Sequence, residues 1–239
     1  MITVPTFAQQ DQKWSQDVMQ PSKWTMGRKG CFITALTMCL NNYGIEITPR
    51  TALAKLIAVN GLNSDGQLTY DGVHRAWPQV HFISREYTRN DPSNNGMEMD
   101  ELTALKKIDR LIQLGNPVMV AVDNMWNDGI PDHAVTFLKT KKDGDVPIDF
   151  LTNDPDGGKQ FWFSEKYGAP IDNVYGYVVL IGDPNSYPDN GLRGFGEAMW
   201  KAAEMRQYAR NLVRKYPNDT DAKRMGTYAN EMIDTMLIV

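Results

Sequence analysis

The order of hydrophobic patterns along this chain limits what it can fold into, because helical periodicity comes first and a run of short strands follows. Apolar side chains recur at helical spacing after Cys31 and again over residues 98–114, and Thr48-Pro49 predicts the start of a helix that runs to about Val59. Alternating or continuous apolar runs then predict strands at 118–122, 134–138, 148–152, 160–163 and 175–181. Helices followed by an antiparallel sheet are typical of an α+β fold.

The composition changes at residues 184–191, which are rich in proline, asparagine and glycine and predict a linker. Beyond it, two apolar stripes at helical spacing are separated by Pro217-Asn218-Asp219 and predict a helical hairpin. We therefore divide the chain into a domain at 1–183, a linker at 184–191 and a helical appendage at 192–239. Two interpretations of the appendage stay open: it packs on its own domain, or its methionine-rich faces bind a partner protein or a second copy.

Charge and composition exclude several classes of protein. A net charge of −4 argues against a general nucleic-acid binder, and two cysteines cannot form a disulfide framework. Three scattered histidines, with no zinc-binding spacing, predict no metal site, and the glycines at 191–196 precede no phosphate-loop lysine, so we expect no cofactor. No stretch approaches the ~20 apolar residues of a membrane span. The first residues do not resemble a signal peptide, so we expect a cytoplasmic location at synthesis.

Cys31 is the first candidate functional residue. It lies between Gly30 and the apolar pattern of a helix, so the thiol is expected at a helix N-terminus. Free backbone N–H groups and the helix dipole favour a thiolate there, and Arg28 and Lys29 act in the same direction. The alternative is a small buried hydrophobic residue, which is how we interpret Cys39 on the apolar stripe of the same helix.

A thiol nucleophile needs a base, and His133 is the best candidate among the three histidines. We expect His74 in a short helix capped by Asp71, and His81 inside a brief strand. His133 instead follows a turn-rich stretch and opens a strand, from which its ring can project into a cleft. Asp154 ends the neighbouring predicted strand, where its carboxylate could orient the imidazole. Alternatively, Asp154 is only the first residue of an Asp-Pro-Asp-Gly turn.

These segments occur in a recognisable order, together with an N-terminal Gln-x-Asp-x-x-Trp element, a Thr-Met-Gly-x-x-Gly-Cys approach and a Gly-x-Pro-Val strand before the histidine. Over about residues 4–182 the chain resembles the bacteriocin-processing, papain-like cysteine peptidases (peptidase C39-like) and their stand-alone relatives. The resemblance implies a papain-like fold, with N-terminal helices packed on an antiparallel sheet. It also implies Cys31 as nucleophile, His133 as base and Asp154 as the orienting residue.

The sequence departs from this pattern at the glutamine that stabilises the oxyanion in papain-like peptidases. That residue commonly lies six positions before the cysteine, where this chain has Thr25. Gln9 is the best substitute, with the backbone N–H of Cys31 as the second donor. The alternative is a structural glutamine that satisfies backbone groups near Trp14.

The resemblance thus predicts a cysteine peptidase or amidohydrolase that cleaves a peptide or isopeptide bond in a protein or in peptidoglycan. The competing hypothesis is a structural or virion assembly protein that keeps the fold with little or no turnover. A phage-encoded protein fits the missing export signal, because lysis or virion assembly would deliver it; a virion location is then expected.

Overall fold

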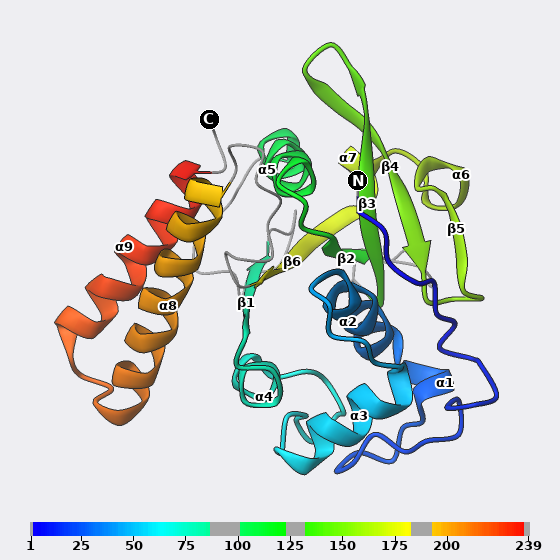
Figure 1. The fold of residues 1–239 in the computed structure, drawn as a ribbon, viewed down its shortest axis with the longest axis horizontal. Helices are drawn as coiled ribbons and strands as arrows, with labels where there is room; N and C mark the ends of the chain where they lie inside the picture. The colour runs from blue at the N-terminus through cyan, green and yellow to red at the C-terminus, as the bar shows by residue number, and fades with distance from the viewer. Residues whose placement is uncertain (1, 87–100, 123–131, 183–192, 237–239) are drawn as a thin grey trace.

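The computed structural model describes residues 2–86, 101–122, 132–182 and 193–236 of the chain, and its centre is one six-stranded antiparallel sheet (Figure 1). The strand order across the sheet is β1-β6-β2-β3-β4-β5. The strands are β1 (Val80–Glu86), β2 (Val118–Val122), β3 (His133–Asp143), β4 (Val146–Asp154), β5 (Lys159–Trp162) and β6 (Val174–Gly182). Helices and antiparallel sheet together confirm the predicted α+β class.

Helices cover both faces of the sheet. One face packs against a cluster formed with α2 (Cys31–Asn42), α3 (Pro49–Ala58) and α4 (Tyr70–Ala76). The other face packs against α5 (Glu101–Gln113) and a hairpin of α8 (Arg193–Lys215) and α9 (Thr220–Met236). Three short helices complete the described part of the chain: α1 (Met26–Lys29), α6 (Ser164–Tyr167) and α7 (Pro170–Asn173).

The central strands are apolar on both sides because both of their faces are buried. In β2, Val118 and Val120 join the core cluster on the α5 side, whereas Met119 joins the cluster on the α2 side. The predicted strands are all present, but β3 and β4 are longer than the apolar pattern indicated. Their outer ends, around residues 139–143 and Val146, are largely exposed, so backbone pairing continues after the hydrophobic signal has ended.

Side-chain capping accounts for the starts of α3 and α4, whereas α2 begins without a side-chain cap. Helix α2 begins at Cys31 as predicted, and α3 begins after Thr48, whose hydroxyl accepts a hydrogen bond from the Thr51 N–H. The predicted cap of α4 is wrong. Thr69, not Asp71, caps this helix by accepting from the Gly72 N–H, because Asp71 already lies inside the first turn.

The C-terminal hairpin packs on its own domain. Met199, Ala202 and Ala203 of α8 and Ile233 of α9 belong to the same core cluster as α5 and the sheet. The structure thus supports the first of the two interpretations of the appendage, and docking of a partner stays a prediction. The predicted linker at 184–191 lies outside the described residues.

The second apolar stripe, predicted at Met225, Tyr228, Met232, Ile233, Met236 and Leu237, packs inward only in part. Ile233 is 1% exposed in the shared core, and Leu237 lies outside the described residues. Ala222 and Ala229 are buried, and Gly226 lies next to Ala209 of α8, where an added Cβ would be 3.6 Å from the Ala209 Cβ. Tyr228 and Met232 are instead 61% and 47% exposed. Small residues let α9 approach α8 closely, while Tyr228 and Met232 are exposed and Ile233 packs in the shared core.

Two methionines of the hairpin test its packing. Met199 is 2% exposed in the shared core, so Met199→Ala should lower the free energy of unfolding by about 2–4 kcal/mol, measured by denaturant titration. Met232→Ala is the matched control at an exposed site and should change it by less than about 0.5 kcal/mol. Equal small losses for both variants would contradict the packing of α8 against the sheet.

Candidate active site

Cys31 is the first residue of α2 and follows a tight junction between α1 and α2. Gly30 is required at this junction, because a Cβ there would lie 2.4 Å from the backbone oxygen of Met26. The first N–H groups of a helix have no acceptor within the helix, so the thiol lies beside free donors. The Cys31 side chain is nearly buried, at 5% exposure.

The order of the strands brings His133 and Asp154 together. His133 opens β3 and Asp154 closes β4, and the two strands are antiparallel neighbours, so their side chains meet at one edge. Nε2 of His133 and Oδ1 of Asp154 are 2.7 Å apart. Cys31 is close enough to the same ring that, with Asp154, it contributes to the raised pKa of His133. The structure thus brings all three predicted residues together.

The electrostatics of this cluster favour an ionic state. Burial by itself disfavours the charged form of His133, but hydrogen bonds to Asp154 and Cys31 and the charges of both outweigh it and raise the histidine pKa from 6.5 to about 9. Burial likewise opposes ionisation of Asp154, yet hydrogen bonds from His133, Lys166 and Tyr167 and the histidine charge lower its pKa to about 2. An imidazolium paired with a carboxylate is therefore the stable arrangement around neutral pH.

Sequence reasoning missed two residues that contact the carboxylate. Lys166 Nζ and the Tyr167 hydroxyl each lie 2.7 Å from Oδ2 of Asp154, and both come from α6. They lie 12 and 13 residues after Asp154, and no periodic pattern links them to it. The turn interpretation of Asp154 also holds, because its Oδ1 accepts from the Asp156 N–H at 2.8 Å.

Gln9 lies beside the segment that precedes the cysteine. Its Nε2 donates to the backbone oxygen of Gly27 at 3.2 Å, and its backbone N–H donates to Pro155 O at 2.8 Å. Gln9 therefore satisfies a backbone group, as the structural alternative predicted. A carboxamide nitrogen carries two hydrogens, so one donor remains beyond the bond to Gly27.

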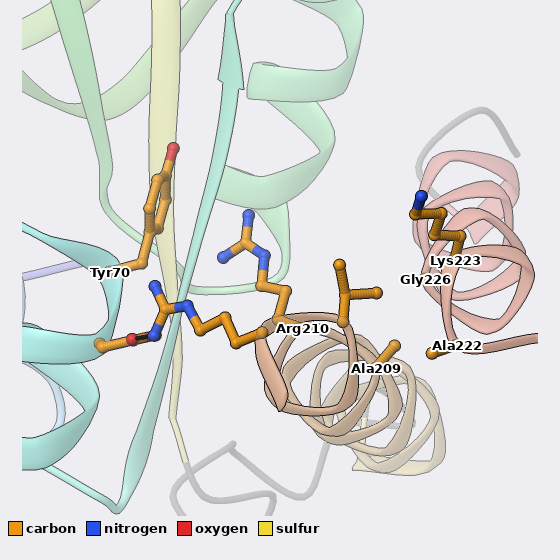
Figure 2. Close-up of a pocket in the computed structure, with 9 residues that line it drawn as sticks. Tyr70, Ala209, Arg210, Ala222, Lys223 and Gly226 are labelled. Carbon is orange, nitrogen blue, oxygen red and sulfur yellow. Dashed lines mark ion pairs between the residues drawn. The ribbon is translucent and has the colours of Figure 1, made fainter. Parts of the chain in front are cut away.

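A cavity of about 380 Å³ lies away from these residues, between α4 and the hairpin (Figure 2). Figure 2 shows Tyr70 of α4 opposite Arg210 of α8, whose guanidinium carbon is 4.5 Å from the ring centre, and Asp71 pairs with Arg214. Neither Cys31 nor His133 lines it. We assign this cavity to the seam that joins the hairpin to the domain, rather than to catalysis.

Neither a metal-binding cluster nor a membrane-spanning helix is found among the described residues. Within them, no group of three or more histidine, cysteine, aspartate or glutamate side chains could hold a metal ion. No helix in this part of the chain combines the length and the apolar character needed to cross a membrane.

The peptidase C39-like family matches residues 1–168 of the 239-residue chain, a range that includes Cys31, His133, Asp154 and Gln9. The match supports a function of the cysteine peptidase type. The chain belongs to the peptidase C39-like family. Strand β6 and the helical hairpin lie beyond the matched range. No curated protein and no solved structure matches the chain.

The raised pKa of His133 predicts a pH-dependent contribution to stability. Because the folded-state value of about 9 exceeds the ordinary 6.5, the charged ring stabilises the fold fully below pH 6.5, and this contribution is lost as the pH rises through about 9. The difference in unfolding free energy between the wild type and His133→Ala should therefore shrink over that interval, as measured by denaturant titrations at several pH values.

His81 is the control of opposite sign. Burial and the charge of His74 lower its pKa to about 4, so the neutral ring stabilises the fold above pH 6.5 and this contribution is lost as the pH falls toward 4. A His133 contribution that stayed constant between pH 6.5 and 9 would contradict the ion-paired arrangement.

Proposed function

We propose that the chain is a cysteine peptidase in which Cys31, His133 and Asp154 act as a catalytic triad. The observation that carries this proposal is the 2.7 Å contact between His133 and Asp154, together with the contribution of Cys31 to the raised pKa of the same histidine. Hydrolysis by a thiol nucleophile needs a base next to the thiol and an acidic group that orients the base.

The chemistry follows from these positions. In the reactive state the proton of Cys31 has passed to His133, so the Sγ thiolate attacks the carbonyl carbon of the scissile bond. The carbonyl oxygen becomes an oxyanion, and the Cys31 N–H and the remaining Nε2 hydrogen of Gln9 are its proposed donors. His133 then protonates the leaving nitrogen, the C–N bond breaks, and a thioester to Cys31 remains. A water molecule that loses its proton to His133 hydrolyses this thioester and restores the thiol.

The proposed substrates are peptide or isopeptide bonds, in a protein or in peptidoglycan. The competing hypothesis, an inactive virion or assembly protein, is less well supported, because a fully buried carboxylate with a charged histidine is costly to desolvate and a structural role does not require it. Phage origin and a virion location stay predictions from the sequence.

The triad predicts a graded set of losses in turnover. With labelled casein and purified peptidoglycan as probes, Cys31→Ala and His133→Ala should abolish hydrolysis, because each removes a group that bonds or transfers a proton. Asp154→Asn should retain partial activity, since it only orients the ring, and Gln9→Ala should lower kcat by about 10²–10³-fold if it holds the oxyanion.

Circular dichroism and thermal unfolding of each variant separate lost chemistry from lost structure. His81→Ala is a matched histidine variant outside the proposed triad and should keep wild-type rates. Wild-type turnover in His133→Ala would refute the proposed base.

A further inference from the structure

The Asp154 carboxylate is held from more directions than its pairing with histidine requires. Its Oδ1 accepts from His133 Nε2 at 2.7 Å and from the Asp156 N–H at 2.8 Å. Its Oδ2 accepts from Lys166 Nζ and from the Tyr167 hydroxyl, both at 2.7 Å. A carboxylate offers about four lone-pair directions, so this fully buried group has a donor for each of them.

The helix that supplies two of these donors is anchored independently of the histidine. Asp149 of β4 accepts from the backbone N–H of Ser164 at 3.0 Å and from its hydroxyl at 2.6 Å. The Phe163 N–H donates to Phe150 O at 2.8 Å, and the Phe163 side chain is fully buried. Helix α6 therefore has a fixed position on the sheet before any contact with Asp154 is counted.

The two donors from α6 contribute in different ways. Lys166 Nζ lies between two carboxylates, 2.7 Å from Asp154 and 3.0 Å from Asp156, and offsets the repulsion between them. Tyr167 is neutral, and its ring stacks on Phe163 with centroids 5.0 Å apart. The packing of that ring aims the hydroxyl at Oδ2, while the ring centre stays 6.4 Å from that of His133.

We propose that Lys166 and Tyr167 are positioning residues for the catalytic reaction: they hold Oδ2 of Asp154 so that Oδ1 faces His133. They touch neither the nucleophile nor the scissile bond in this role. The expected effect on kcat rests on the proposed peptidase function. The expected effect on the orientation of His133 does not depend on that function.

Tyr167→Phe is the cleanest kinetic test, because it removes one hydroxyl and keeps the ring that packs on Phe163. We expect kcat to fall about tenfold, the size of one hydrogen bond to a charged group, with KM unchanged. Lys166→Met should cause a similar or larger fall, and Lys166→Arg should restore most of the rate. Lys139→Met, at an exposed lysine of β3, is the matched control and should keep wild-type values.

A titration of the His133 ring by NMR, in the full chain with Cys31→Ala, tests the positioning without any substrate. Tyr167→Phe in that background should lower the pKa of His133, because a carboxylate free to rotate makes a weaker hydrogen bond to the imidazolium. Thermal unfolding checks that both variants are folded.

The kinetic measurement and the NMR titration together distinguish a failure of the positioning inference from a failure of the proposed peptidase function. If the wild type hydrolyses nothing but Tyr167→Phe still lowers the His133 pKa, the positioning stands and the peptidase proposal fails. An unchanged or raised His133 pKa in Tyr167→Phe overturns the inference, as does a wild-type kcat in both Tyr167→Phe and Lys166→Met.

Discussion

The site depends on the burial of one charged carboxylate, that of Asp154. Removing such an ion from water costs several kcal/mol unless hydrogen bonds and opposite charge compensate for it. Here the compensating groups come from the start of β3, from the turn after β4 and from α6, so those three parts of the chain must meet at one point. The contacts that offset the cost of burying the Asp154 carboxylate also fix the orientation of His133. Stability and the proposed catalysis therefore depend on the same interactions.

The position of Cys31 near this carboxylate depends on contacts of the N-terminal segment. Residues near the N-terminus connect the two halves of the site: the Gln9 N–H binds Pro155 O just after Asp154, and its side chain binds Gly27 O just before α2. Gln10 adds contacts to Asp156 and Gly157 in the same turn. The N-terminal segment thus links the turn that follows Asp154 to helix α1, which precedes Cys31, and so brings Gln9 near both residues.

Much of this could be predicted from the sequence where a local pattern had one dominant cause. The strands of the buried sheet, the start of α2 at Cys31 and the meeting of His133 with Asp154 follow from apolar periodicity and from the edge that two neighbouring antiparallel strands share. The contacts of Lys166 and Tyr167 could not be predicted, because they depend on how a four-residue helix is anchored by Asp149. The predicted packing stripe of α9 was right only in part, for a related reason. Ile233 is buried as expected, but close helix approach also selects Ala222, Gly226 and Ala229, while Tyr228 and Met232 are exposed.

The most direct test of the account is the pH dependence of alkylation of the two cysteines by iodoacetamide, followed by peptide mass spectrometry, in the wild type and in His133→Ala. Cys31 should be alkylated readily at neutral pH in the wild type, because a neighbouring imidazolium favours the reactive thiolate, and much more slowly in His133→Ala. Cys39 should stay unlabelled in both, because burial raises its pKa to about 12. Equal, slow labelling of both cysteines, or Cys31 reactivity that is the same without His133, would contradict the claim that these residues form one catalytic unit.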